Sequence, residues 1–481
     1  MKKINLKFLV LVTLVVFFCA CSHSKKEGTT SDPNNAVKSG EEAVVGLVSL
    51  AVSPVEMSVL KGDTLQFKAV GTYSDSTTAD ITNAVVWSSS DATIASINAD
   101  ALATGLVVGL SNIKATIGSV SNETSLKVKM QVLYLPNTDS GDVSMYEINF
   151  NTGLLSPLAP AVVSVGQAGD NPMVVELHPN GKYAYVGYMN SAGSFLNIFD
   201  IDQNTGVLTN VASPVQINNV VSTILDIKVH PSGAFLYATT LDNNSAYMTK
   251  FNILANGLLT QSGVPTPLVG APFYMTFHPS GSVLYLVDLF PNNNKVLEYK
   301  VNLTTGDLTP LGSGFIHVQN IRDLAVHPTE NNIYIARMLT GGFSIIVNYK
   351  LNADYSIGDV YHTQNTVFGV MRILMNHLKN SLYALAQPNG GGKLGRHSLT
   401  GIELSNVLQP QIVTNSSMNM INDPMGKFLY VTNGSNNTIS MYKVDEDGQL
   451  SALNPATVPT GNNNTPSIAQ KMATAIIPAG L

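Results

Sequence analysis

A repeat of about fifty residues constrains the fold of this chain more than any other feature of the sequence. A tyrosine inside an apolar strand recurs at intervals of 51, 52, 48, 49, 49 and 47 residues. These tyrosines are Tyr134, Tyr185, Tyr237, Tyr285, Tyr334, Tyr383 and Tyr430. Periods of this length are typical of proteins built from stacked structural units. The chain from about residue 130 to its end is therefore predicted to be a repeat array.

Each repeat has room for four short strands. A turn precedes the tyrosine by seven residues, as in His178-Pro179-Asn180-Gly181 and His230-Pro231-Ser232-Gly233. A second strand follows the tyrosine, and a glycine-containing hairpin such as the one at Gly206 leads to an outer strand. Four strands in about fifty residues is the size of a propeller blade. Residues 130–481 are therefore predicted to form a seven-bladed β-propeller.

The two ends of the array predict how the ring closes. The array begins at a tyrosine strand with no inner strand before it, and it ends with an unpaired apolar segment, residues 466–478. We expect this segment to complete blade one beside residues 132–136, which removes two exposed sheet edges.

The N-terminus has the pattern of a lipoprotein signal. Three lysines precede an apolar run over residues 8–20, which is too short to cross a bilayer as a helix. The run ends in Phe18-Cys19-Ala20-Cys21, which resembles a lipobox, and the chain has no other cysteine. We expect residues 1–20 to be removed, Cys21 to carry a lipid that anchors the protein to the membrane, and residues 21–45 to be a flexible tether. Ser22 in place of aspartate indicates an outer-membrane lipoprotein of the cell envelope.

Residues 46–129 show short alternating strands separated by turn residues. The order of Pro54, Gly62-Asp63-Thr64, Trp87-Ser88-Ser89-Ser90 and Gly105 resembles the bacterial immunoglobulin-like (Ig-like) domain of group 2. The fold class expected for the whole chain is all-β, an Ig-like β-sandwich followed by the propeller. Trp87, the single tryptophan, is expected to be a core residue of the sandwich. The resemblance implies a spacer or an adhesive module.

Composition and the spacing of motifs argue against several kinds of partner and cofactor. Charged residues make up only 12% of the chain, and the 26 lysines and arginines form no basic stripe, so no nucleic-acid partner is expected. The turn histidines occur once per blade and cannot converge on one metal ion, so no metal is expected. No motif indicates a cofactor, and we expect a monomer.

Inner strands of a propeller line its axis, so polar residues on them are candidate site residues. The residues four positions before each turn are Val174, Asp226, Tyr274, Asp323, Arg372 and Asn419. Two positions before the turn, Glu176 and Lys228 are charged. Buried charges need partners or a ligand. Two interpretations stay open: a plug of Asp–Arg and Glu–Lys pairs around water, or a small-molecule site.

The pattern HPxGxxxYV, followed by VxxY and a TG hairpin, resembles the β-propeller lactonase family, which includes bacterial 6-phosphogluconolactonases. The resemblance implies an imidazole or a carboxylate as general acid or base, and an arginine that holds the ester oxyanion or a substrate carboxylate. Here Arg322 stands where the family has arginine, but Phe273 and Asp323 replace histidines and Arg337 replaces glutamate. Asp323 beside Arg322 could act as a base, with its pKa lowered by the arginine.

Three functional hypotheses follow. The first is a non-enzymatic cell-envelope lipoprotein whose propeller binds a small molecule or an envelope protein or glycan, with the Ig-like domain as a spacer. The second is a lactone or sugar-acid hydrolase with catalytic candidates Arg322, Asp323 and Arg372. The third is a surface adhesin. Because two histidines and the glutamate of the family pattern are missing, the first hypothesis is preferred.

Overall fold

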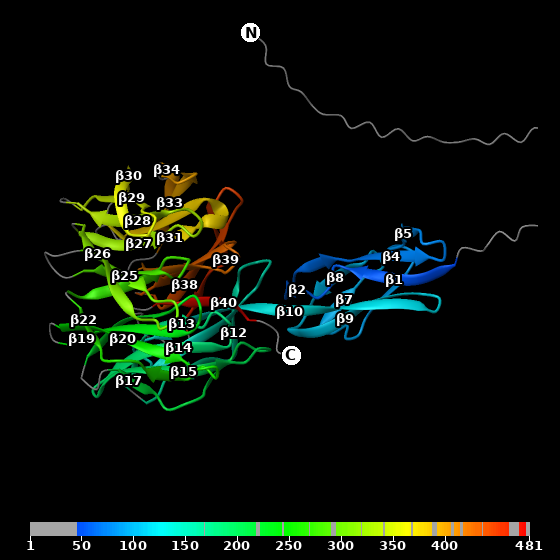
Figure 1. Ribbon diagram of the computed structural model, residues 1–481, viewed down its shortest axis with the longest axis horizontal. Coiled ribbons are helices and arrows are strands. Elements are labelled where there is room, and N and C mark those ends of the chain that lie inside the picture. The colour runs from blue at the N-terminus through cyan, green and yellow to red at the C-terminus, as the bar shows by residue number, and fades with distance from the viewer. Residues whose placement is uncertain are drawn as a thin grey trace, which may run out of the picture. The chain divides into compact units, whose positions relative to one another are not determined.

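The chain folds almost entirely into strands, as the computed structural model shows (Figure 1). It describes residues 46–477 except 168, 218–221, 243–244, 269, 290–294, 319, 340–341, 367–368, 387–391, 406–407, 414–416, 435 and 461–470. Within these residues the only helical element is the short 3-10 turn η1 (His377–Lys379), and no helix there is long and apolar enough to cross a bilayer. The expected signal, Cys21 and tether lie outside the described residues.

The first part of the described chain is a sandwich of short strands. One sheet has the order β1 (Leu47–Ser53), β4 (Lys68–Tyr73), β5 (Thr78–Asp80), and a second has the order β3 (Thr64–Gln66), β8 (Leu102–Gly105), β7 (Ala95–Ile97). The remaining strands are β6 (Val86–Ser89), β9 (Gly109–Ile117), β2 (Met57–Leu60) and β10 (Val120–Asn137), where β10 pairs with both β9 and β2.

Trp87 is a core residue of this sandwich, as the sequence predicts. Its side chain packs in a cluster with Phe67, at a ring-centroid distance of 6.3 Å. The indole N–H donates to the carbonyl oxygen of Thr82 at 3.0 Å, which satisfies the polar atom of a largely buried ring.

Six antiparallel sheets of four or five strands follow, one for each of blades two to seven. Their inner strands are β13 (Asn171–Leu177), β18 (Thr223–Val229), β23 (Pro272–Phe277), β27 (Ile321–Val326), β31 (Val370–Asn376) and β36 (Ser417–Asn422). The second strands, which carry the repeated tyrosines, are β14 (Tyr183–Asn190), β19 (Phe235–Asp242), β24 (Val283–Asp288), β28 (Asn332–Met338), β32 (Ser381–Ala386) and β37 (Phe428–Asn433).

The third and outer strands complete these blades. The third strands are β15 (Gly193–Ile201), β20 (Ser245–Ile253), β25 (Lys295–Val301), β29 (Ser344–Leu351), β33 (Gly392–Thr400) and β38 (Thr438–Val444). The outer strands are β16 (Leu208–Asn210) with β17 (Val215–Ile217), β21 (Leu259–Gln261) with β22 (Thr266–Leu268), β26 (Leu308–His317), β30 (Ile357–Asn365), β34 (Glu403–Leu404) with β35 (Leu408–Val413), and β39 (Leu450–Pro459).

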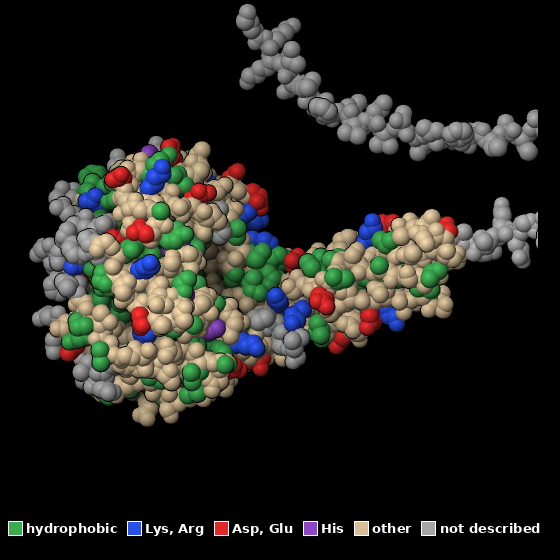
Figure 2. All heavy atoms as spheres, in the orientation of Figure 1, with side chains coloured by type: hydrophobic (Ala, Val, Ile, Leu, Met, Phe, Trp, Pro, Cys, Tyr) green, Lys and Arg blue, Asp and Glu red, His purple; other side chains and the backbone are tan. Residues whose placement is uncertain are grey.

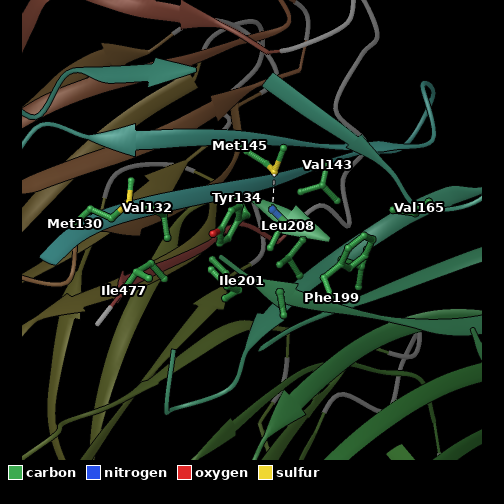
Figure 3. Close-up of a cluster of buried hydrophobic side chains, with 14 of the residues drawn as sticks. Met130, Val132, Tyr134, Val143, Met145, Val165, Phe199, Ile201, Leu208 and Ile477 are labelled. Carbon is green, nitrogen blue, oxygen red and sulfur yellow. Dashed lines mark hydrogen bonds between the residues drawn. The ribbon is translucent and has the colours of Figure 1, made fainter. Parts of the chain in front are cut away.

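Blade one combines the two ends of the array. Its strands are β40 (Ala473–Ile477), β10, β11 (Asp142–Ile148) and β12 (Leu155–Ser164). The red strand β40 lies antiparallel beside the cyan β10 in Figure 1, and it pairs with residues 130–134 rather than the expected 132–136. Ile477 is fully buried beside Met130 and Val132, in a cluster that includes Phe199 of blade two (Figure 3). The C-terminal strand therefore belongs to the apolar core.

The strand β10 is longer than the sequence analysis allows for. It passes from the sandwich into blade one without a break, across the expected boundary between residues 129 and 130. No turn residue interrupts the run, so the strand continues from one set of partners to the next.

The repeated tyrosines join each blade to the next. Each ring is buried, and each hydroxyl donates to a backbone carbonyl in the hairpin of the following blade. The acceptors, in order from Tyr134, belong to Gly206, Gly257, Gly306, Tyr355, Ile402, Gly448 and Gly153. Tyr430 bonds to Gly153 at 2.9 Å, which ties blade seven to blade one.

Candidate ligand site on the propeller axis

A register shift places one side chain of each inner strand toward the axis. In β18 the shift falls between Ile224 and Asp226, and in β27 it falls between Ile321 and Asp323. The inner strands β13, β23, β31 and β36 have shifts near the same position. A β-bulge inserts one residue and re-aims its neighbour, and such bulges are frequent beside functional sites. In β13, β18, β23, β27 and β31 the residue after the shift is the one four positions before the turn. In β36 that residue, Asn419, lies within the shift between Ser417 and Met420.

Blade one supplies a seventh member that the sequence analysis missed. In the other blades this residue lies opposite the second residue after the tyrosine, as Asp226 does with Thr239. Ala473 of β40 lies opposite Tyr134, so the same register leads back two residues to Lys471. Lys471 exchanges backbone hydrogen bonds with Met173 and Val175 of blade two. We call the resulting set the axial ring: Lys471, Val174, Asp226, Tyr274, Asp323, Arg372 and Asn419.

The axial ring surrounds a cavity of about 220 Å³. Lys471, Tyr274, Asp323, Arg372 and Asn419 line it. Glu176, Lys228 and Thr276, two positions further along their strands, also line the cavity. Asp226 does not line the cavity; it is fully buried and contacts the ammonium of Lys471, which does. The structure thus brings the predicted candidates together, except Arg322. Met472 and Met420 add apolar wall that the sequence analysis did not name.

Tyr274 holds two cations against its ring. The guanidinium carbon of Arg372 lies 3.9 Å from the ring centroid, and the Lys471 ammonium lies 4.7 Å from it. Stacking on an aromatic face stabilises a cation and fixes the plane of a guanidinium. Contacts of Arg372 with side-chain oxygens are long, at 3.8 Å to Asp323 and 3.4 Å to Asn419. The fork of Arg372 is therefore positioned but weakly bonded.

Two aspartates of the axial ring are used by the backbone. Asp226 accepts hydrogen bonds from its neighbour Ile227 at 2.9 Å and from Met275 of the next blade at 2.7 Å. Asp323 repeats this arrangement with Leu324 at 2.9 Å and Ile373 at 3.0 Å. These bonds join adjacent inner strands at the bulges. Both carboxylates consequently have a structural role in addition to facing the cations.

A further ion pair lies at the more exposed side of the cavity. Lys228 Nζ is 2.7 Å from Glu176 Oε2, and the two side chains are 30% and 18% exposed. The Arg372 and Asp323 side chains are only 12% and 11% exposed. The Asp–Arg and Glu–Lys pairs anticipated from the sequence are therefore both present, and the Lys471–Asp226 pair is additional.

Burial dominates the electrostatics of the cavity. It lowers the pKa of Lys471 to about 8, against the opposing effect of Asp226. Burial also raises the pKa of Asp323, which Arg372 opposes. The expected lowering of the pKa of Asp323 by Arg322 is therefore wrong, because desolvation outweighs the effect of Arg372, the arginine that faces Asp323. Burial works against the charge of Lys228, but Glu176 and Asp226 keep its pKa above the usual value.

Arg322 does not line the cavity, contrary to the expectation for the hydrolase site. Arg322 is the inserted residue of the bulge in β27, so its side chain does not point to the same side of the strand as that of Asp323. Its guanidinium lies 3.6 Å from the sulfur of Met338, and its buried Nε has no hydrogen-bond partner among the described residues.

The turn histidines join neighbouring blades. His178 Nε2 lies 3.0 Å from the carbonyl oxygen of Gly233, and His230 Nε2 lies 2.9 Å from that of Gly281. Asn376 replaces the histidine in blade six and donates to Gly426 at 2.9 Å. Each of these side chains therefore bonds to the turn of the next blade.

Charges on the visible surface are mixed. On the face drawn in Figure 2, acidic and basic side chains of the described residues lie interspersed among uncharged ones. The axial cavity concentrates charge more than this surface does.

Two family models match the chain. Residues 48–132 match the bacterial Ig-like domain of group 2. Residues 235–370 match the lactonase family described as a seven-bladed β-propeller. Both resemblances read from the sequence are thereby shown. The lactonase match covers blade three without its inner strand, together with blades four and five, and includes Tyr274 and Asp323 of the axial ring.

Curated relatives repeat this division. Ice-binding protein 1 of Shewanella frigidimarina is 45% identical over 87 residues, which is 18% of this chain and 10% of that protein. The 6-phosphogluconolactonase of Pectobacterium carotovorum is 26% identical over 195 residues, 40% of this chain and 56% of the relative. The 6-phosphogluconolactonase of Blochmanniella pennsylvanica is 25% identical and matches 67% of this chain and 94% of its own length.

Solved structures share the propeller fold. A Bacteroides fragilis protein provisionally assigned as a 6-phosphogluconolactonase has a TM-score of 0.58 at 18% identity, over 72% of this chain and 98% of its own. A periplasmic gluconolactonase of Pseudomonas aeruginosa has a TM-score of 0.57 at 15% identity, over 73% of this chain and all of its own. These structures show that the chain shares their propeller fold, while its substrate and activity require separate argument.

Proposed function

We propose that the axial cavity binds a small sugar acid or its lactone. The observation that carries the proposal is Arg372, whose fork is fixed on Tyr274 and weakly bonded to side-chain oxygens at 3.4 and 3.8 Å. Such a guanidinium suits a carboxylate, which it can bind through two parallel hydrogen bonds, and it can also donate to the carbonyl oxygen of a lactone. The lactonase-type propellers among its relatives support a ligand of this class.

The binding proposal is tested by calorimetric titration of the purified chain with gluconate. Arg372→Ala should weaken binding at least about tenfold, because a charge-assisted bidentate contact contributes more than about 1.4 kcal/mol. Arg372→Lys should recover only part of the affinity, since lysine lacks the planar fork. Arg322→Ala is the matched control, because Arg322 lies in the neighbouring inner strand and does not line the cavity. Equal losses in both alanine variants would contradict a site at Arg372.

Lactone hydrolysis is the second candidate, and Lys471 favours it. With a pKa of about 8, part of the Lys471 population is a neutral amine that can accept a proton from an attacking water. Arg372 would stabilise the oxyanion that forms when the water oxygen bonds to the carbonyl carbon. As the oxyanion collapses and the ring C–O bond breaks, the ammonium would give the proton to the leaving alkoxide. Binding without turnover is preferred, because Asp226 and Asp323 are held by backbone N–H groups. Ring opening of glucono-δ-lactone that rises through about pH 8 and is lost in Lys471→Met would reverse this preference.

We propose that Cys21 anchors the protein to the membrane and that the propeller binds its partners in the envelope. The support is the position of the two cysteines of the chain, Cys19 and Cys21, at the end of an apolar run that lysines precede. Cys21→Ala should move the expressed protein from the detergent phase to the aqueous phase of a phase-separation assay. Cys19→Ala, two residues earlier, is the control that should keep the membrane partition. Unchanged partition of the Cys21 variant would exclude lipidation there.

The Ig-like domain acts as a spacer in this proposal, and adhesion stays an alternative.

A further inference from the structure

The three cations of the cavity are not equally committed to their carboxylate partners. Lys228 is 2.7 Å from Glu176, and Lys471 is in direct contact with Asp226. Arg372 is 3.8 Å from the nearest oxygen of Asp323, which bonds to two backbone N–H groups instead. Only Arg372 therefore has most of its hydrogen-bonding capacity left for a ligand.

The paired glutamate lies on the more exposed side of the cavity. Glu176 and Lys228 are 18% and 30% exposed, whereas Arg372 and Lys471 are 12% and 13% exposed. A ligand whose carboxylate binds Arg372 would extend toward solvent past Glu176. The far end of such a ligand would meet Glu176, and the ammonium of Lys228 beside it already bonds to Glu176.

We propose that Glu176 limits the charge of the ligand, so that the cavity accepts a sugar acid with one negative charge, or a neutral lactone, and rejects one that also carries a phosphoryl group. This inference rests on the proposed binding function. A phosphoryl group brings about −1.5 to −2 charges and needs several donors or cations. Here it would face Glu176, and like charges brought together across a binding interface weaken binding. The relatives named for a phosphorylated sugar lactone would then differ from this chain in the charge of the ligand.

The test compares gluconate with 6-phosphogluconate by titration calorimetry on the full chain. Wild type should bind gluconate at least about tenfold more tightly than 6-phosphogluconate. Glu176→Gln removes the negative charge, keeps the side-chain size and frees Lys228. The variant should bind 6-phosphogluconate about tenfold more tightly than wild type does, with a change of less than about threefold for gluconate. Glu446→Gln is the matched control, because Glu446 pairs with Lys379 at 2.7 Å on the surface and is 96% exposed.

The outcomes separate the two proposals. Equal or tighter binding of 6-phosphogluconate by wild type overturns the charge limit while the binding function stands. A folded Glu176→Gln protein that discriminates as strongly as wild type also overturns the role of Glu176. If neither compound binds, the proposed function itself fails. The wild-type comparison decides the charge limit even if the variant does not fold.

Discussion

At the scale of single residues, the position whose backbone carbonyl accepts the tyrosine hydroxyl is occupied by different residues in different blades. The hairpin position that accepts the tyrosine hydroxyl is glycine at a positive φ in most blades, but Tyr355 occupies it in blade five at φ 64°. That conformation is costly for a residue with a Cβ. Tyr355 stacks on His278 of the preceding blade at 3.9 Å, which offsets part of this cost. The junction of blades four and five is thus built differently from its counterparts.

Glu298 lies at this same junction and predicts a pH dependence of stability. It is buried, accepts a hydrogen bond from Ile357 N at 2.6 Å, and burial raises its pKa to about 7. The folded protein therefore retains a proton that the unfolded chain loses near pH 4.5. The free energy of unfolding should fall as the pH rises between about 4.5 and 7, because the folded state binds more protons there.

Substitution by glutamine should remove this dependence. Glu298→Gln keeps the acceptor for Ile357 and cannot ionise, so its melting temperature should exceed that of wild type at pH 8. The difference should shrink at pH 5, where wild type is protonated in the folded state. Calorimetric melting at the two pH values measures it. Glu446→Gln should show no such trend, and a Glu298 variant that behaves like this control would be evidence against a buried proton.

At the scale of elements, bulges decide where the candidate site lies. Alternation along the inner strands correctly predicts that Tyr274, Asp323 and Arg372 face one cavity. The expectation that failed, Arg322 at a hydrolase site, came from the family pattern and not from alternation, and the register shift between residues 321 and 323 is a backbone feature that the pattern does not signal. Lys471 was missed for another reason. Counting back from the turn motif of the repeat cannot find Lys471, because no such motif follows it in the sequence, whereas aligning Ala473 with Tyr134 does.

The strand β40 also predicts the effect of a truncation. Deleting residues 466–481 removes Ile477 from the core of blade one and leaves β10 with an unpaired edge. We expect a loss of more than about 4 kcal/mol, since removing one large buried side chain typically costs 2–5 kcal/mol. The melting temperature should drop sharply, or the protein should aggregate. Deleting only residues 479–481 leaves β40 in place and is the control. Equal melting of both truncations would show that β40 is not needed for closure.

At the scale of the whole molecule, the period of the tyrosines was enough to predict the propeller and its number of blades. The reason is physical, because the tyrosine of each repeat bonds to the hairpin of the next and is needed once per blade. The passage of β10 from sandwich to propeller was not predicted. A boundary drawn from composition marks where the pattern of residues changes, and backbone pairing can continue across it.

The pairing of β40 with β10 has a consequence for synthesis. Tyr134 and Ala473 are partners, yet the ribosome makes the second 339 residues after the first. Contacts so distant along a chain form late and slowly. Six blades can assemble while translation continues, but Lys471, which blade one contributes to the cavity lining, is synthesised only just before the closing strand β40. A nascent or prematurely terminated chain therefore lacks the complete cavity, and, under the proposed function, binding of a sugar acid would report on completed synthesis.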